Sequence, residues 1–224
     1  NIASMLGISP LVVGLTVVAF GTSAPEVAVG LKAGLSGQAG VTVGNAVGSN
    51  IINVLLILGL SAAMAPLVIA QKLIRLDVPI MIGVSAMVLV FGYDGVFSRT
   101  EGVIFVLGII GYVIFSIYES RQESQAVKDE YEVEYRRTSA HTPGQWTRNG
   151  VYIIVGLAFL VFGADRLVDS AVVMARSFGI SELMIGLTVV AIGTSLPEIA
   201  TSVVATLRGE RDIVVGNIIG SNIF

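Results

Sequence analysis

A long uncharged stretch of this sequence limits what the chain can fold into. Residues 41–71 form 31 consecutive positions without a charged side chain. About 20 apolar residues in a helix are enough to cross the hydrocarbon core of a membrane. The run therefore predicts a membrane protein, and the fold class that we expect is an all-α polytopic bundle.

Composition narrows the chemistry that such a bundle could perform. Only 13% of the residues are charged, against about 25% in a typical soluble domain. A net charge of −3 gives no basic surface for nucleic acid. The chain has no cysteine and one histidine, His141, which excludes disulfides, thiolate nucleophiles and metal sites built on cysteine or on two histidines. Functional groups must come from Asp, Glu, Asn, Ser, Thr and backbone carbonyls.

Six apolar segments and the start of a seventh are predicted to be helices. Their ranges are 9–36, 42–70, 76–93, 99–119, 149–176 and 181–207, and the seventh begins near 213. Ser9 before Pro10 is typical of a helix start. Ser98 and Glu101 have the spacing of a capping box at the start of helix 99–119.

One segment, 119–148, has the mixed charge of a solvated linker, and we expect His141 to be an exposed polar residue within it. It divides the chain into a first half at 1–118, with a motif region at 8–53, and a second half at 149–224, with a motif region at 180–224.

The balance of Lys and Arg predicts the orientation in the membrane. Alternating loops place nine of these residues on the linker side and three on the other, while Arg166 falls inside a span. The nine are Lys72, Arg75, Arg121, Lys128, Arg136, Arg137, Arg148, Arg208 and Arg211; the three are Lys32, Arg99 and Arg176. Cytoplasmic loops carry the excess of positive charge, so the linker is predicted to be cytoplasmic.

An internal repeat is the most informative feature of the sequence. Residues 8–52 align without a gap on 180–224, at a constant offset of 172, with 25 identities in 45 positions. Helix 181–207 comes five helices after helix 9–36, an odd number of steps, so the two copies cross the membrane in opposite directions. Inverted repeats in transporters place the binding site near the midplane, where the copies meet and helices are interrupted.

The repeat also predicts that this sequence is a fragment of a longer protein. Ala175 and Gly179, at the end of helix 149–176, align with Ala3 and Gly7. We expect at least one helix before residue 1 and more after residue 224.

Two carboxylates in the repeat have no structural explanation. Glu26 lies in GTSAPEVA and Glu198 in GTSLPEIA, each near the middle of a long apolar stretch. A lone carboxylate in such a place costs several kcal/mol unless it has a partner. A cation is the simplest partner that both copies could share.

The neighbouring residues supply further oxygen atoms. Pro25 and Pro197 lack an N–H and so leave a carbonyl without its helical donor one turn earlier, near Gly21 and Gly193. At helical spacing one face carries the Glu of each copy together with three small residues. These are Ala19, Thr22 and Ser23 in the first copy, and Ala191, Thr194 and Ser195 in the second.

A polar stripe follows in the second part of each copy. Asn45, Ser49 and Asn53 share a helix face, and Asn217 and Ser221 repeat it; the counterpart of Asn53 would be position 225. Gly44 and Gly48 allow a neighbouring helix to approach closely.

The donors are all hard oxygens, which suit Ca²⁺ or Na⁺ rather than Zn²⁺ or Cu²⁺. Simpler interpretations exist for each feature alone. Small residues in apolar helices usually serve packing, and Ser or Thr hydroxyls usually bond to their own helix. Asp165, Arg166 and Asp169 are best explained by a local ion pair between Arg166 and Asp169. Duplication of the whole pattern favours the functional interpretation.

The paired motifs GTSAPE…GNAVGSNIIN and GTSLPE…GNIIGSNIF resemble the two alpha-repeats of the sodium/calcium exchanger family, within the cation/Ca²⁺ antiporter superfamily. The prokaryotic calcium/sodium antiporters are the most similar type. The resemblance implies an inverted-repeat transporter of ten helices, of which about seven, the second to the start of the eighth, are present.

The resemblance also implies roles for individual residues. Glu26 and Glu198, with the carbonyls of Thr22 and Thr194, would bind Ca²⁺. Residues that would line Na⁺ sites are Ala19, Ser23, Ser49, Asn53, Ala191, Ser195 and Ser221. Pro25, Pro197, Asn45, Asn217, Gly21 and Gly193 would support them. The Ca²⁺/H⁺ branch usually carries an acidic residue where Gly48 and Gly220 stand here, which favours Na⁺ as the coupling ion.

The predicted function is therefore a secondary antiporter, not an enzyme, that exchanges Ca²⁺ for Na⁺ by alternating access in the inner or plasma membrane. Its expected partners are membrane lipid and inorganic cations; no cofactor, nucleic acid or protein partner is predicted. A Ca²⁺/H⁺ exchanger on the same scaffold, a passive cation channel and a structural membrane subunit are the alternatives.

Overall fold

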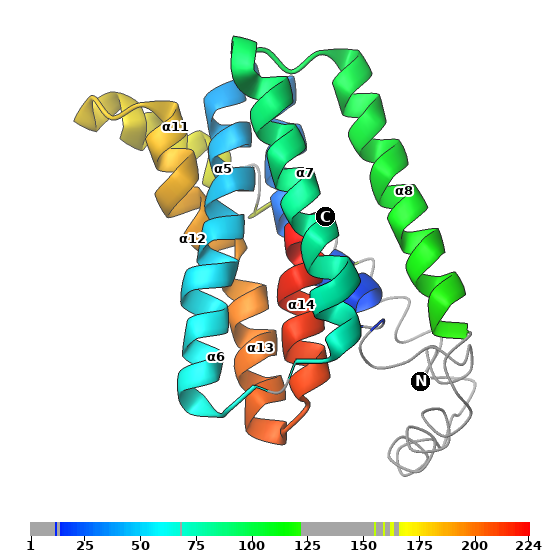
Figure 1. Cartoon of the computed structure of the whole chain (residues 1–224). Helices are drawn as coiled ribbons and strands as arrows, with labels where there is room; N and C mark the ends of the chain where they lie inside the picture. The colour runs from blue at the N-terminus through cyan, green and yellow to red at the C-terminus, as the bar shows by residue number, and fades with distance from the viewer. Residues whose placement is uncertain are drawn as a thin grey trace. The chain divides into compact units, whose positions relative to one another are not determined.

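The computed structural model describes residues 12, 14–67, 69–121, 155, 159, 162–163 and 166–224. Every regular element among them is helical (Figure 1). Three continuous helical stretches are long and apolar enough to cross a membrane: Ala39–Met64, Leu73–Asp94 and Arg99–Glu119. Two bent helix pairs, Gly14–Thr22 with Ala24–Leu35 and Glu182–Thr194 with Leu196–Arg208, bring the number of possible spans to five. The all-α membrane class is confirmed.

The helical stretches are built from several elements in chain order. The first copy of the repeat gives η1 (Gly14–Val18), α3 (Ala19–Thr22), α4 (Ala24–Leu35), α5 (Ala39–Ile52), η2 (Asn53–Leu58) and α6 (Gly59–Met64). Between the copies lie η3 (Leu73–Asp77), α7 (Val78–Phe91), η4 (Gly92–Asp94) and α8 (Arg99–Arg121). The second copy gives α11 (Glu182–Ile185), η6 (Gly186–Val190), α12 (Ala191–Thr194), α13 (Leu196–Arg208) and α14 (Arg211–Ile223).

Several predicted helix boundaries were wrong by a few residues. The helix predicted at 42–70 runs from Ala39 to Met64, because Pro66 disfavours the helical conformation at the residue before it. The next helix begins at Leu73 rather than 76, and the last at Arg211 rather than 213. Residues 166–178 are helical, whereas most of the rest of predicted helix 149–176, the Ser9–Pro10 start and nearly all of the linker, including His141, lie outside the described residues.

The capping box at Ser98 and Glu101 is confirmed. The Glu101 side chain accepts a hydrogen bond from the Ser98 backbone N–H at 2.6 Å, and the Ser98 hydroxyl accepts one from the Glu101 N–H at 3.3 Å. Ser181 caps α11 in a similar way by accepting from the Met184 N–H at 3.2 Å.

Replacing Ser98 with alanine should lower the free energy of unfolding by about 1 kcal/mol, because a helix-end N–H loses its acceptor. Urea unfolding of the detergent-solubilised protein, followed by circular dichroism, measures this loss. Ser98→Asp keeps an acceptor and should restore most of it. Equal stability of the Ser98→Ala variant and the parent protein would show that the cap contributes nothing.

The chain forms two compact units, and each contains segments from both halves of the sequence. The first unit comprises residues 1–20, 61–138 and 202–224, and the second comprises 21–60 and 139–201. The division into two halves at the linker stays a prediction, since most of 119–148 lies outside the described residues.

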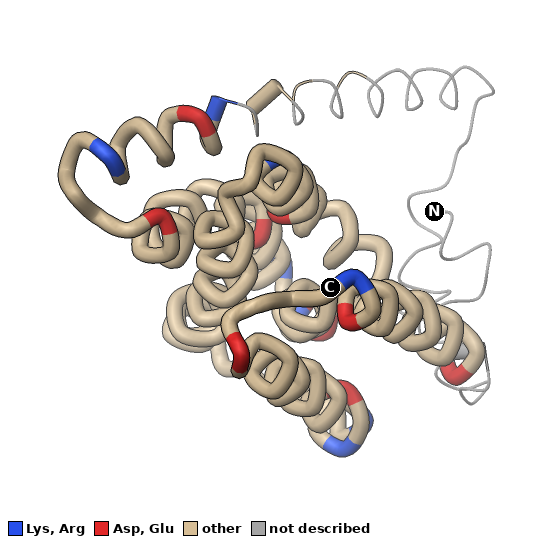
Figure 2. Tube along the Cα trace, turned by 90° about the horizontal axis from the view of Figure 1, so that it is seen from above, with Lys and Arg blue, Asp and Glu red and all other residues tan. Residues whose placement is uncertain are grey.

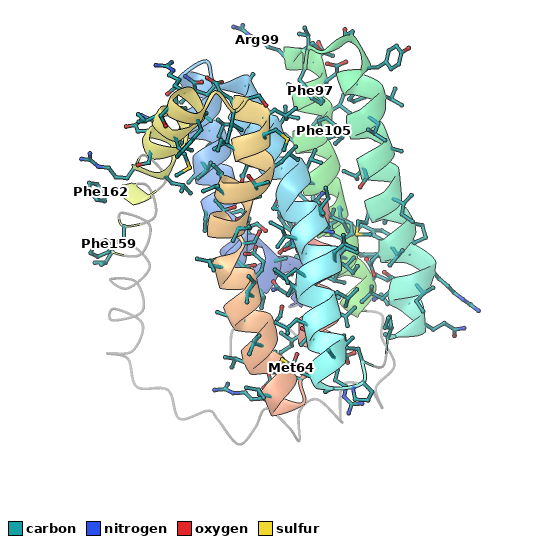
Figure 3. The ribbon with its side chains drawn as sticks, turned by 90° about the vertical axis from the view of Figure 1, so that its left-hand side faces the viewer. Met64, Phe97, Arg99, Phe105, Phe159 and Phe162 are labelled. Atoms are coloured by element: carbon teal, nitrogen blue, oxygen red, sulfur yellow. The ribbon has the colours of Figure 1, made fainter. Side chains whose placement is uncertain are left out.

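Within the first unit, α14 packs against η1 and α7 (Figure 1). Its core contains Leu15, Leu73, Tyr112, Val215 and Ile219. Figure 3 shows Arg99 and Phe97 at one end of this unit and Met64 at the other. Phe97 and Phe91 both contact the ring of Phe105 near the turn between α7 and α8.

Within the second unit, α5 packs against α11, η6 and α12, as Figure 1 shows for the labelled helices. Each unit thus joins a helix of one copy of the repeat to the π-helical turn of the other: α5 to η6 here, and α14 to η1 in the first unit. Figure 2 marks the Lys, Arg, Asp and Glu positions along the backbone, and most of the described helix length carries none of them.

The close approach expected at Gly48 is confirmed, and the same contact occurs at its repeat counterpart. A Cβ atom added to Gly48 would lie 2.5 Å from the carbonyl oxygen of Leu187. In the first unit, a Cβ added to Gly220 would lie 2.6 Å from the carbonyl oxygen of Leu15. Neither distance leaves room for any side chain, so only glycine fits at these two positions.

Candidate ion-binding site

Each copy of the repeat contains a helix that bends at its Gly-Thr-Ser-x-Pro motif. The first helix bends by 49° at Ser23 and the second by 43° at Ser195. Pro25 and Pro197 stand at the beginning of the helix that follows each break, where a missing N–H costs least. A π-helical turn lies one short helix before each break, and such turns are frequent at functional sites. The predicted interruption of these helices is confirmed.

The two bends bring the carboxylates of the repeat into one hydrogen-bonded group within the second unit. The Ser23 hydroxyl donates to Oε1 of Glu198 at 3.2 Å, and the Ser195 hydroxyl donates to Oε1 of Glu26 at 3.3 Å. The serine of each copy therefore bonds the glutamate of the other. The Glu198 side chain is 1% exposed, while Glu26 is partly buried with a fully buried Oε2.

Asn45 connects the two motifs from the polar stripe of α5. Its side-chain N–H donates to the backbone oxygen of Glu26 at 3.4 Å, and its Oδ1 accepts from the Thr194 hydroxyl at 2.9 Å. The Asn45 side chain is 2% exposed. The resemblance implied a supporting role for Asn45, but its bonds to both copies of the repeat could not be predicted from spacing alone.

The rest of the α5 stripe is buried as the spacing predicts. Ser49 and Asn53 are both buried, and the stripe continues into the π-helical turn that begins at Asn53. The Ser49 hydroxyl donates to the carbonyl oxygen of Ala46 at 3.1 Å, so its proton is held by its own helix. The lone pairs of the Ser49 hydroxyl oxygen could still coordinate a cation.

Three predicted site residues belong to the first unit. Ala19, Asn217 and Ser221 are buried there, where a Cβ at Gly220 would also meet the Cβ of Ala19 at 2.7 Å. The assignment of Ala19 and Ser221 to Na⁺ binding and the supporting role of Asn217 stay predictions, as do the roles of Gly21, Gly193 and the carbonyls of Thr22, Thr194 and Ala191.

The group in the second unit has the donor chemistry of a hard-cation site. The two glutamates supply its carboxylate oxygens, and the described residues contain no cluster of three or more His, Asp or Glu side chains. Hydroxyl, amide and carbonyl oxygens surround the two glutamates. Ca²⁺ takes six to eight oxygen ligands in loose geometry, and Na⁺ is also a hard cation that binds oxygen.

The local ion pair expected between Arg166 and Asp169 is not formed in the described residues. The Arg166 guanidinium lies over the ring of Phe162, 5.1 Å from its centroid, and the exposed arginine is satisfied by this cation–π contact. Asp165 lies outside the described residues.

Sequence reasoning overlooked one buried carboxylate, Asp77 in the first unit. Placing the helix start at residue 76 made Asp77 an end residue, whereas it lies one turn inside the span that begins at Leu73. Its hydrogen bond from Tyr112, at 3.0 Å, joins positions 35 residues apart. The only sequence signal was an acidic residue next to a long apolar run.

Known proteins resemble this chain over nearly its whole length. The profile of the sodium/calcium exchanger protein family matches residues 1–118 and 149–224. A putative antiporter, CaxA of Alkalimonas amylolytica, is 41% identical over 224 residues, which are 100% of this chain and 69% of that protein. The sodium/calcium exchanger MaX1 of Methanosarcina acetivorans is 33% identical over an alignment that covers 100% of this chain and 72% of the relative.

Solved structures show the same similarity. The sodium-calcium exchanger NCX_Mj, soaked with Na⁺ and Sr²⁺, superposes with a TM-score of 0.69 at 34% sequence identity. The match covers 99% of this chain and 69% of that structure.

Proposed function

This chain belongs to the sodium/calcium exchanger family of cation/Ca²⁺ antiporters, and we propose that its protein moves Ca²⁺ out of the cytoplasm in exchange for entering Na⁺. The family is one of membrane transporters. The choice of Na⁺ over H⁺, the direction of Ca²⁺ movement and the site residues are the parts that we propose.

The observation that carries the proposal is the reciprocal bonding of Ser23 to Glu198 and of Ser195 to Glu26. Two carboxylates from different copies of an inverted repeat share one small group of oxygens. Two carboxylates in one hydrogen-bonded group repel each other, and a divalent cation between them would remove both the repulsion and the cost of burial.

Exchange follows if Na⁺ and Ca²⁺ compete for the same oxygens. Two glutamates balance one Ca²⁺, or two Na⁺ that use the same carboxylates. Binding of Na⁺ would therefore weaken Ca²⁺ binding, and binding of either ion would satisfy the buried charge during the change of access. Glycine at positions 48 and 220 supports Na⁺ as the coupling ion, since the proton-coupled branch is expected to carry an acidic residue there.

Transport by the purified protein in liposomes tests the coupling ion. We expect an outward Na⁺ gradient to drive uptake of radiolabelled Ca²⁺, and a pH gradient of equal size without Na⁺ to drive none. Uptake driven by the pH gradient alone would identify a Ca²⁺/H⁺ exchanger. Ca²⁺ flux that ignores Na⁺ on the opposite side would identify a channel.

The direction of transport depends on the orientation of the protein, and the distribution of positive charge supports a cytoplasmic linker. In the first unit, Lys72, Arg75 and Arg211 lie at the beginnings of helices and Arg208 at the end of one, whereas Arg99 starts α8 at the opposite end of the hairpin (Figure 1). Because the chain has no cysteine, a single Ser139→Cys variant can report the side of the linker. In right-side-out vesicles, an impermeant maleimide should label the new cysteine only after the membrane is permeabilised. Labelling in intact vesicles would show that the linker lies on the outside.

Removing either hydroxyl of the reciprocal pair should weaken Ca²⁺ binding. A hydrogen bond to a charged group contributes about 1.5–3 kcal/mol, so Ser23→Ala and Ser195→Ala should each raise the Ca²⁺ concentration for half-maximal exchange about tenfold or more. Concentration series of Ca²⁺ uptake measure this shift. Ser85→Ala is the matched control, because that hydroxyl is exposed and bonds only to the Met81 carbonyl of its own helix. Unchanged affinity in both site variants would exclude the two serines from the site.

A further inference from the structure

The first unit holds a buried carboxylate that the proposed exchange does not use. Asp77 is 2% exposed and lies in η3, one turn inside a membrane span. Its Oδ1 accepts a hydrogen bond from the Tyr112 hydroxyl at 3.0 Å. Its Oδ2 is also buried and meets no hydrogen-bond donor among the described residues.

The charged groups around Asp77 leave its carboxyl without an ion pair in the described part of the chain. On its own helical stretch, Lys72 is paired with Glu119 of α8 at 3.5 Å and attracts the Asp77 carboxylate from beyond ion-pair distance, and Arg75 is exposed. On α8, Tyr112 is the hydrogen-bond donor and Glu119 is the partner of Lys72. The charged residues of α14, Arg211 and Asp212, stand at its start, and the part of α14 that joins this core is apolar.

Apart from the buried Ser116 hydroxyl near Tyr112, the core next to Asp77 is hydrocarbon. Leu73 and Tyr112 pack with Leu15, Val215 and Ile219, and Ala70 and Val78 complete the contact. An ionised carboxylate with one bare oxygen in such a core costs several kcal/mol, whereas a protonated carboxyl carries no charge and keeps the hydrogen bond that Tyr112 donates to Oδ1.

The same hydrogen bond also attaches α8 to η3, beside the apolar contacts of Ile109 and Val113. Among the described side chains of that helix, Tyr112 and Ser116 are the two that are buried, and the others are half-buried or exposed. The Lys72–Glu119 pair at the end of the helix is partly exposed and contributes about 1 kcal/mol at most. Loss of the Asp77 proton would therefore change the hydrogen bond from Tyr112 that joins α8 to η3.

We propose that Asp77 is a proton-binding site, separate from the two-glutamate site, and that its proton controls the docking of α8 on η3 and α7. With the proton bound, the carboxyl is neutral and α8 stays packed through Tyr112. When the proton leaves, the carboxylate draws water toward Oδ2, and the free end of α8 separates from η3. The hairpin turn near Phe97 and Phe105 keeps the other end in place.

Spin labels on the two helices test this proposal, because the chain has no native cysteine. Ile74 and Tyr118 are 54% and 64% exposed on η3 and α8, so nitroxides on Ile74→Cys and Tyr118→Cys do not enter the core. As pH rises, the distribution of distances between the two nitroxides should become broader and its mean should increase. Adding Asp77→Asn, which mimics the protonated side chain, should keep it narrow at every pH. A distribution that ignores pH, or one that responds equally with Asn at position 77, would overturn the proposal.

Infrared spectroscopy gives a second test that does not need the variant to be stable. In the parent protein with ¹³C-labelled aspartate, a protonated aspartic acid carbonyl band should be present at neutral pH and shifted by the label. It should persist in the Glu26→Gln and Glu198→Gln variants, which separates this proton from the ion-binding site. If no aspartic acid band is seen at neutral pH, Asp77 is ionised and the proposal fails.

Discussion

Replacing Glu26 or Glu198 with glutamine should reduce Ca²⁺ exchange more than a hundredfold. Either change removes one of the two carboxylates that would bind Ca²⁺. The remaining carboxylate alone would then have to hold the cation. Breaking one partner of a buried charge pair costs about 3–5 kcal/mol, which is at least a hundredfold in affinity. The two variants should lose activity to a similar extent, because their serine contacts are reciprocal. Na⁺-driven uptake of radiolabelled Ca²⁺ measures the effect.

Glu101→Gln is the matched control for this experiment. Glu101 is a membrane-helix glutamate outside the site, and glutamine can replace glutamate in a capping box. Its exchange rate should equal that of the parent protein. If a folded Glu26→Gln or Glu198→Gln variant also exchanged Ca²⁺ at the parent rate, these carboxylates would not be the ligands.

Replacing Gly48 or Gly220 with alanine should strongly destabilise the protein. Each added Cβ would lie within 2.6 Å of a backbone carbonyl oxygen, and backbone atoms of a packed helix cannot move aside as a flexible side chain can. Overpacking of this kind typically costs about 1–3 kcal/mol, and contact with backbone places the effect at the upper end. We expect a lower midpoint of thermal unfolding in detergent and a lower yield of folded protein for both variants.

Gly59→Ala is the control for the glycine variants. It lies on the same continuous helical stretch as Gly48, and a Cβ there would have no atom within 4 Å. Alanine is the better helix former, so this variant should be as stable as the parent protein or slightly more stable. Equal stability of Gly48→Ala and Gly59→Ala would show that α5 and η6 are not held as closely as described.

The sequence predicted much of the fold and of the site because the repeat supplies information that a single copy lacks. Two glutamates at the same place in both copies exclude an accidental charge, and Pro25 and Pro197 identify where the helices bend. The spacing of Asn45, Ser49 and Asn53 predicted a buried polar face, because a continuous helix fixes which side chains share a side.

The contacts between elements could not be predicted, because periodicity gives the face of a helix and not its neighbour. Ser23 bonds Glu198 rather than Glu26, which is nearer in the sequence, and this depends on how the two copies pack, with α4 against α12 and α5 against η6. The contact of Asp77 could not be predicted for the same reason, because its hydrogen-bond partner, Tyr112, is 35 positions away in the sequence. The helix end at Met64 could have been predicted from Pro66, but the continuing apolar run concealed it.

The number of Ca²⁺ ions bound per chain tests the central claim, which is that the two copies of the repeat form one shared site. Equilibrium binding of radiolabelled Ca²⁺ in the absence of Na⁺ should give one ion per chain for the parent protein. It should give no measurable binding for either Glu26→Gln or Glu198→Gln alone. Two ions in the parent protein, with one retained by each single variant, would mean that each copy binds its own cation, and would contradict the shared site.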